Sequence, residues 1–352
     1  MRGLRRGSVV ILAAITLSLT GCTPGMMQQM WADYGNNNDS VTDWTGGDGT
    51  FSVELPDGRI VWLFSDTYLG HVEEGARRSS APPIVNNSLV VQAVDGGDLG
   101  PTLTAPDFLG SGYWTMDGTV EGSTLRVFAN QLGGTTSGIA SFSLPDLVRT
   151  GPVQGVPSVH PDVAGVIFWG GSILEQPDYT YVYGDARPTG ALYFTTYLAR
   201  VPAGQLTTAT WEYWTGSGWS TDLLDSNPLA TTDGANVRAS GSVVANEGHF
   251  VLVGKESQPF TDEIRAYTSP TPWGPFTGPT ALYDTPEFGQ PCGESTMFTY
   301  RVNAHPAFQQ KDENTMLFSY NVHCWPNEDY DPAWNYADAT LYRARFIGLD
   351  LP

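Results

Sequence analysis

The chain of 352 residues is strongly acidic, with 37 Asp and Glu residues against 17 Lys and Arg residues and a formal net charge of −20. This charge opposes binding to nucleic acid and to anionic lipid headgroups, and favours a neutral or cationic partner. The chain contains 40 Gly and 25 Pro residues, and its apolar residues occur in short alternating runs between turn residues rather than with a helical period. These features predict an all-β fold.

The amino terminus has the pattern of an export signal, predicted to span residues 1–21. A basic start precedes an apolar run from Val9 to Leu19, which is too short to span a membrane. The sequence Leu-Thr-Gly-Cys that ends at Cys22 resembles the lipobox of bacterial lipoproteins, in which the cysteine is lipidated. The alternative is a secreted protein with a chance cysteine. We expect a lipoprotein on the outer face of the bacterial cell membrane, held only by its anchor, with residues 22–41 as a polar tether.

Residues 46–70, GGDGTFSVELPDGRIVWLFSDTYLG, are predicted to form a β-hairpin with its turn at Asp57, because an Asp-Gly pair separates two apolar runs. Asp48 and Asp66 each lie nine residues from Asp57, so the two acids should meet across the strands. Like charges placed there destabilise the pair and drive the two pKa values apart, which suits the acid and base of glycoside hydrolysis. Either acid alone is better explained as a turn or capping residue. The matched pair favours a functional site.

Five segments share one pattern, in which small or polar residues lead into an apolar strand, a turn and a second strand. None of them could bury both of its faces alone, so they predict a single five-bladed β-propeller over residues 42–352. The segments are GDGTFSVELPDGRIVWLFSDT, NNSLVVQAVDGG with TLRVFAN, FWGGSILEQPDYTYVYGD, VRASGSVVANEGHFVLVGKE and YRVNAHPAFQQKDENTMLFSYN.

In such a fold, the polar residues that open each unit face a central cavity. We therefore expect five residues from neighbouring blades to contact the substrate, although strand starts with ordinary turn composition are the alternative. The expected substrate-binding residues are Asn87, Asp117, Trp169, Arg238 and His305.

Cys292 and Cys324 are the cysteines that follow Cys22, and an even pair in an exported protein predicts one disulfide, with two buried thiols as the alternative. The five His residues lack the spacing of a zinc site, and no acidic run matches a calcium-binding loop. We predict no cofactor and no metal centre, and leave open a structural cation in the channel.

The hairpin, the strand NNSLVV, the stretch WTMDGTVEGSTLRVF and the segments NAHPAF and LFSYN resemble a group of exported bacterial five-bladed propellers of formerly unknown function. This group is related to the endo-D-arabinanases of glycoside hydrolase family 183, and the resemblance covers nearly all of the chain after the tether. It implies furanoside hydrolysis by two acids, with Asp48 and Asp66 at the matching positions. Arabinan-cleaving propellers carry an acid in each of the first three blades, whereas Glu175 of the third unit is expected in a loop.

We therefore expect a monomeric glycoside hydrolase that cleaves internal arabinofuranosyl linkages, of the D-arabinan type, in a cell-envelope polysaccharide. An apolar run precedes Asp66, so Asp66 is the expected proton donor and Asp48 the expected base. Related propeller furanosidases invert, which makes inversion the expected outcome. The alternative is a non-catalytic, carbohydrate-binding propeller lipoprotein, which would not need two opposed carboxylates.

Overall fold

The computed structural model describes residues 23–37, 41–73, 77–78, 84–104, 112–133, 136–256, 260–309, 315–325 and 333–352. Residues 1–21 and Cys22 lie outside the described residues, so the export signal and the lipidation stay predictions. Within the described ranges, no helix combines the length and the apolar character that a membrane span requires.

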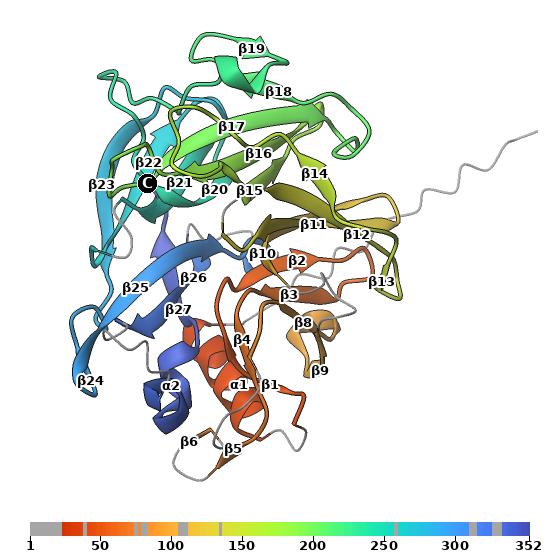
Figure 1. The fold of residues 1–352 in the computed structure, drawn as a ribbon, viewed down its shortest axis with the longest axis vertical. Coiled ribbons are helices and arrows are strands. Elements are labelled where there is room, and N and C mark those ends of the chain that lie inside the picture. Colours follow the sequence, from red (N-terminus) through yellow and green to blue (C-terminus); the bar gives the residue numbers. More distant parts are fainter. Residues whose placement is uncertain are drawn as a thin grey trace, which may run out of the picture.

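Five antiparallel sheets follow one another along the chain (Figure 1), which confirms the predicted all-β fold. The first contains β2 (Phe51–Glu54), β3 (Ile60–Phe64), β8 (Ser88–Gln92) and β9 (Leu99–Thr104). The second contains β10 (Tyr113–Glu121), β11 (Thr124–Gln131), β12 (Ser137–Ser143), β13 (Val148–Arg149) and β14 (Gln154–Val156). The third contains β15 (Phe168–Glu175), β16 (Tyr179–Ala186), β17 (Thr195–Pro202), β18 (Glu212–Trp214) and β19 (Trp219–Ser220). The fourth contains β20 (Ser240–Asn246), β21 (His249–Lys255), β22 (Glu263–Ser269) and β23 (Thr277–Asp284), and the fifth β24 (Pro291–Cys292), β25 (Ser295–Ala304), β26 (Thr315–Cys324) and β27 (Arg345–Asp350).

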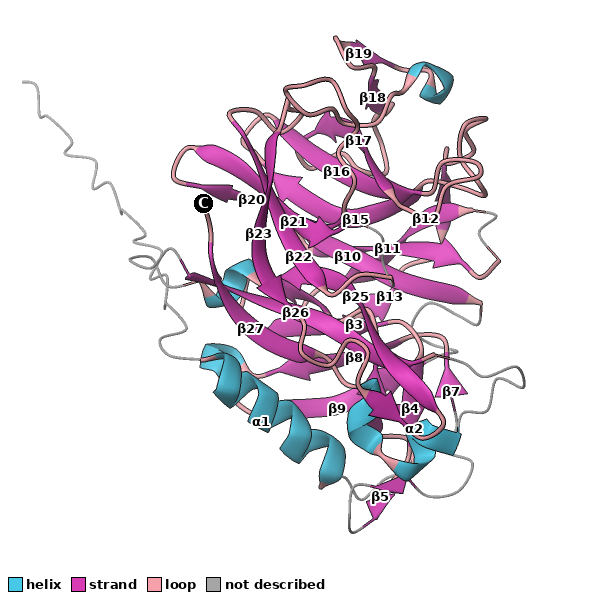
Figure 2. Cartoon of the chain, turned by 90° about the vertical axis from the view of Figure 1, so that its left-hand side faces the viewer, coloured by secondary structure: helices cyan, strands magenta, loops and turns pink. Residues whose placement is uncertain are grey.

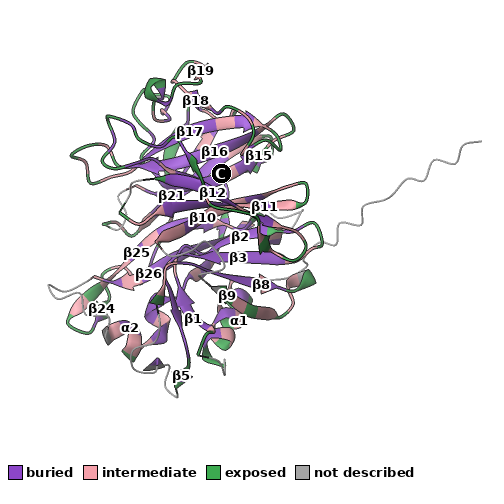
Figure 3. Cartoon of the chain, turned by 45° about the vertical axis from the view of Figure 1, so that its right-hand side comes forward, coloured by how far each residue is buried: buried purple, intermediate pink, exposed green. Residues whose placement is uncertain are grey.

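The core is divided into apolar clusters that lie between consecutive sheets, and Figure 3 shows the buried strands in which they lie. Phe128 of the second sheet packs with Trp169 of the third, for example. The strands are rich in Val, Ile, Tyr and Phe, which pack well on a pleated surface. Each sheet therefore contributes apolar side chains to both of its faces, and no sheet could bury its core without its neighbours.

The first strands of the first four sheets, β2, β10, β15 and β20, and β25 of the fifth sheet contact one another in that order. The fifth sheet also reaches the first, because Ser52 of β2 is hydrogen-bonded to His305 at 2.8 Å and Thr50 donates to Asn321 of β26 at 3.1 Å. The first and last sheets of the chain are thus neighbours, and residues far apart in the sequence meet there.

Two small sheets and six helical segments complete the described part of the chain (Figure 2). One sheet contains β1 (Trp44–Gly47), β4 (Thr67–Leu69) and β7 (Ile84–Val85), and the other β5 (Val72–Glu73) and β6 (Arg77–Arg78). The longer segments near the site are α1 (Pro24–Asn36), α2 (Ala333–Ala337) and the 3₁₀ helix η4 (Ala339–Tyr342); η1 (Val94–Gly96), η2 (Leu223–Asp225) and η3 (Pro306–Phe308) are short 3₁₀ turns.

The segment expected to be a polar tether is largely helical, and that expectation is wrong for α1. Thr23 caps the helix by accepting a hydrogen bond from the backbone of Met26 at 3.3 Å, with Pro24 at the first helical turn. Met27 and Trp31, one turn apart, are buried in a cluster with the first and fifth sheets. Two large apolar side chains at this spacing are the signal for a packed helix.

One of the five predicted units was divided wrongly. The strand NNSLVV, which includes β8, pairs with β3 and completes the first sheet, whereas TLRVFAN lies in β11 and pairs with β10. The other four units correspond to the first two strands of the first sheet, β15 with β16, β20 with β21, and β25 with β26. The error arose because β10 contains polar residues and a bulge, which hide its alternation.

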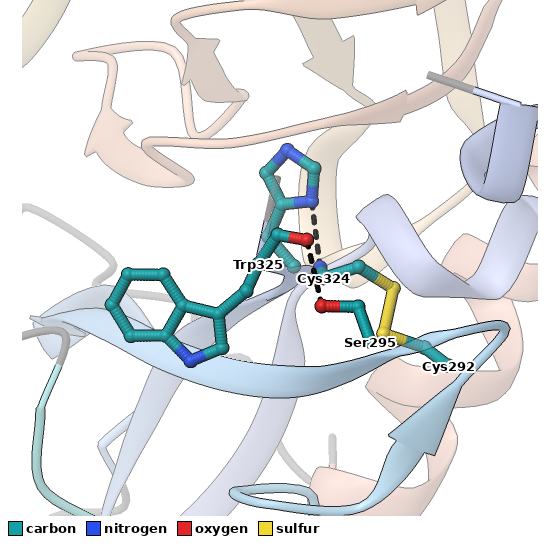
Figure 4. Close-up of a disulfide and its surroundings, with 5 residues drawn as sticks. Cys292, Ser295, Cys324 and Trp325 are labelled. Carbon is teal, nitrogen blue, oxygen red and sulfur yellow. Dashed lines mark hydrogen bonds between the residues drawn. A yellow bond between two sulfur atoms is a disulfide. The ribbon is translucent and has the colours of Figure 1, made fainter. Parts of the chain in front are cut away.

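The structure joins Cys292 of β24 to Cys324 of β26 in a disulfide, with their Cα atoms 6.1 Å apart (Figure 4). Next to it, the hydroxyl of Ser295 donates to the carbonyl oxygen of Trp325 at 2.9 Å. These contacts fix the end of the β24–β25 hairpin to the end of β26, near the C-terminal segment.

Candidate active site

Two acidic residues lie side by side at the open end of the β2–β3 hairpin. The backbone N–H of Asp48 donates to the carbonyl oxygen of Asp66 at 3.1 Å, and the N–H of Ser65 donates to the carbonyl oxygen of Asp48 at 2.8 Å. The strands pair with Phe51 opposite Leu63, in the register that a turn at residue 57 predicts. The two acids are therefore cross-strand neighbours, as their equal spacing from the turn indicated.

A backbone irregularity sets Asp48 apart from the regular strand. Gly49 and Thr50 have φ angles of 85° and 49°, in the left-handed region that most side chains disfavour. A Cβ atom at residue 49 would also approach the backbone nitrogen of Ser65 to 3.1 Å, which favours glycine there. The irregularity separates β1 from β2 and places Asp48 between the two sheets to which these strands belong.

Asp48 is the more strongly perturbed acid. Desolvation by burial, followed by repulsion from Asp66, raises its pKa from 3.8 to about 7. The hydroxyl of Tyr300 opposes this by donating to Asp48 Oδ2 at 2.8 Å, and the hydroxyl of Tyr342 also lowers the pKa. Asp48 Oδ1 is buried and accepts no regular hydrogen bond from the described residues. Protonation removes this unpaired charge, so Asp48 can carry a proton near neutral pH.

Asp66 has different partners. Its Oδ1 accepts hydrogen bonds from Asn86 Nδ2 at 3.2 Å and from Trp114 Nε1 at 3.0 Å. Desolvation raises the pKa of Asp66, and these two donors lower it. The expectation that Asp66 is the more desolvated acid is wrong, because the apolar residues before it pack in the clusters between the first sheet and its neighbours, whereas the fifth sheet and the C-terminal segment enclose Asp48.

A cavity of about 590 Å³ borders Asp48 and Trp114, the residue that holds Asp66. Phe168 and Phe194 add apolar surface to its wall, and the guanidinium of Arg187 lies over the ring of Phe194 at 5.1 Å. Aromatic faces with a few polar groups between them suit a sugar ring, whose own faces are apolar and whose edge carries hydroxyls.

Arg301 of β25 is a charged residue in the lining of this cavity. Its guanidinium pairs with the buried Asp185, and it also donates to Ser240 Oγ at 3.3 Å and to the carbonyl oxygen of Gly171. Burial raises the pKa of Asp185, while Arg301 lowers it. One side chain of the fifth sheet thereby binds the third and fourth sheets at the point where the first strands converge.

Three of the five predicted substrate residues belong to the core, with no exposed surface. Asn87 donates to the carbonyl oxygen of Tyr113 at 2.8 Å, and Trp169 packs between the second and third sheets. His305 lies between two serine hydroxyls, and burial lowers its pKa to about 3. These three side chains have no surface with which to contact a substrate in this structure, because neighbouring sheets that the sequence pattern does not show cover them.

The other two lie away from the cavity of Asp48. Arg238 is at the surface, 3.4 Å from Glu256. Asp117 borders a second cavity of about 490 Å³, where it accepts hydrogen bonds from the backbone of Gly118 at 2.8 Å and of Ile173 at 2.9 Å. Burial raises the pKa of Asp117 to about 7. Its two hydrogen bonds connect β10 to β15, which is a structural role.

Glu175 also borders the second cavity. It is the last residue of β15 rather than a loop residue, and its pKa is raised by desolvation and by Glu121. The structure does not bring Glu175 together with the acids of the hairpin.

The predicted site did not include Asn86, Trp114, Tyr300 or Arg301, which contact the acids or line their cavity. Asn86 directly precedes the predicted residue Asn87. No local signal distinguished the other three, since their partners lie in other sheets. These three are Trp114, Tyr300 and Arg301. Among the described residues, no group of three or more His, Cys, Asp and Glu side chains is placed to hold a metal ion.

The fold and the site define an all-β protein with two neighbouring acids, one of which lines a cavity. Comparison with known families shows where it belongs: the family described as "Domain of unknown function (DUF5005)" matches residues 31–100 and 101–350, and the chain belongs to this family. None of the curated proteins matches the sequence.

Several solved structures have a similar fold. A "putative hydrolase" from Bacteroides ovatus ATCC 8483 is 20% identical, with a TM-score of 0.65 over 92% of this chain and 88% of that one. A GH43_1 enzyme from Xanthomonas citri is 12% identical, with a TM-score of 0.51 over 91% and 93%. A GH43 β-xylosidase/α-arabinofuranosidase from a compost microbial metagenome, in complex with xylotriose, is 11% identical, with a TM-score of 0.51 over 88% and 92%. At these identities the likeness shows the fold.

Proposed function

We propose that this protein is a glycoside hydrolase that cleaves internal arabinofuranosyl linkages, of the D-arabinan type, in a cell-envelope polysaccharide. The observation that carries the proposal is the cross-strand pair Asp48 and Asp66, two neighbouring acids with different hydrogen-bond partners, of which Asp48 lines a cavity and Asp66 is hydrogen-bonded to Trp114 in its wall. Paired carboxylates in unequal environments supply the acid and the base that glycoside hydrolysis needs. The likeness in fold to the GH43 enzymes supports the reaction class, and the resemblance to family 183 supports the substrate.

The proposed architecture is a five-bladed propeller, in which each of the five sheets is a blade. The serial contacts of the first strands and the bonds between the first and fifth sheets support it. The protein is further proposed to be a monomer, lipidated at Cys22 and held on the outer face of the membrane, where polymers are within reach.

In the proposed mechanism, Asp48 is the acid and Asp66 is the base, the reverse of what the sequence suggested. Asp48, with a pKa of about 7, holds the proton that the leaving oxygen needs. Asn86 and Trp114 donate to Asp66 and favour its ionised form, in which it activates a water molecule, or attacks the sugar if the enzyme retains configuration. The aromatic wall of the cavity orients the sugar ring.

The test uses the full chain, purified in detergent from membranes of an expressing bacterium. It is incubated with bacterial arabinogalactan, and with pectic arabinan, xylan and fructan as comparators, and the products are separated by chromatography. A ladder of oligosaccharides from arabinogalactan supports the proposal, whereas monosaccharide alone contradicts internal cleavage. Binding without any product would favour a carbohydrate-binding protein.

A further inference from the structure

Two phenol groups from separate parts of the chain converge on Asp48. Tyr300 lies on β25 of the fifth sheet, and its hydroxyl donates to Asp48 Oδ2 at 2.8 Å. Tyr342 ends the 3₁₀ helix η4, and its hydroxyl interacts with both Asp48 and Tyr300. The mechanism described above needs the two acids but assigns no role to these tyrosines.

We propose that Tyr300, supported by Tyr342, is a positioning residue that holds the carboxyl group of Asp48 in place and sets how readily it gives up its proton. This inference rests on the proposed function. A phenol can donate to the ionised carboxylate and accept from the protonated one, so the contact persists while Asp48 loses and regains its proton. An amide or ammonium N–H cannot accept a hydrogen bond from the protonated carboxyl group.

Packing holds both rings in place. Tyr342 contacts the rings of Tyr68 and His323 edge-on, at centroid distances of 5.1 and 4.9 Å, and Tyr300 packs on Phe298 at 5.3 Å. Tyr300 also lines the cavity. A tyrosine that served only to fill the core would not need its hydroxyl on a carboxylate at the edge of a cavity.

Tyr300 is unsuited to act as the nucleophile itself. Burial and the charge of Asp48 raise the pKa of Tyr300 well above its usual value, and the same causes raise that of Tyr342. Both phenols therefore keep their protons at neutral pH. The titratable groups that face Asp48 are Asp66 on its own hairpin, Tyr300 on β25 and Tyr342 on η4.

The test replaces Tyr300 by Phe, which removes only the hydroxyl. Tyr320→Phe is the matched control, because the hydroxyl of Tyr320 donates to Glu287 at 2.7 Å in the same sheet but away from the cavity. Two quantities are measured: the pH dependence of kcat/KM on arabinogalactan, and the carboxyl titration of Asp48 from infrared difference spectra of each protein against its Asp48→Asn counterpart.

In the Tyr300→Phe variant we expect the alkaline limb of the pH profile and the Asp48 titration to move upward together by about one pH unit, because the lost bond favoured the ionised acid. We also expect kcat to fall about tenfold to a hundredfold with little change in KM, and the control to match wild type. An unmoved Asp48 titration, or a covalent sugar adduct trapped on Tyr300, would overturn the inference. Wild type that hydrolyses no polysaccharide would instead overturn the proposed function, and the titration would still decide the role of Tyr300.

Discussion

Replacing Asp48 by Asn should abolish turnover and yet stabilise the fold. The folded-state pKa of Asp48 is about 7 against 3.8 for the free side chain. Below pH 3.8 the group is protonated in both states and adds nothing; as pH rises toward 7, only the unfolded state ionises, so stability falls. Above pH 7 both states are ionised and the loss of folding stability is complete. The difference between the two pKa values corresponds to about 4 kcal/mol. Since the cavity admits some water to the carboxyl group, we expect the Asp48→Asn variant to be about 2 to 4 kcal/mol more stable than wild type above pH 7.

The assay is urea unfolding of both proteins between pH 4 and pH 8, beside hydrolysis of arabinogalactan. The variant should equal wild type in stability near pH 4 and exceed it at pH 8, with activity below about 0.1% of wild type. Asp57→Asn is the control, because Asp57 is an exposed acid at the turn of the same hairpin, paired with Arg59. Its activity should not change. A variant of Asp48 that is less stable than wild type at pH 8 would refute the burial argument, and activity within about tenfold of wild type would refute the catalytic role.

Three further outcomes are expected. Trp114→Phe keeps a ring in the cavity wall but removes the donor to Asp66, so the acid limb of the pH profile should move upward while KM changes less than about threefold. Arg301→Met leaves the buried carboxylate of Asp185 without its cation, and urea unfolding should show a loss of about 3 to 5 kcal/mol at pH 7; an unchanged midpoint would contradict the pairing. Replacing Cys292 and Cys324 together by Ala opens a loop with a sequence separation of 32 residues, which should cost about 3 to 4 kcal/mol.

The hairpin could be predicted because all of its information is local. A turn between two alternating runs sets the register, and the register sets which residues face each other. The same logic recovered β15 with β16, β20 with β21, and β25 with β26. It failed at β10, where a bulge and polar residues break the alternation, and at α1, where a short apolar stripe in an Asn-rich segment was read as a tether.

The residues around the acids could not be predicted, because their positions depend on how the sheets pack against each other. His305 and Trp169 have the chemistry of binding residues, yet neighbouring sheets bury them completely. Tyr300 and Arg301 reach the site only because the fifth sheet lies next to the first. The spacing of residues along the chain does not show which side chains of another sheet lie close to the site.

The structure also explains how one hairpin can supply two acids with different roles. Asn86, which precedes β8, and Trp114 of β10 both donate to one oxygen of Asp66. Residues of the fifth sheet and the C-terminal segment, Tyr300 and Tyr342, enclose Asp48 and leave its other oxygen unpaired. The two aspartates thereby differ in proton affinity, because residues from different parts of the chain surround them. Without the fifth sheet, Asp48 would lose the phenol of Tyr300 and part of its burial, so the proposed division between acid and base depends on the contact between the first and last sheets.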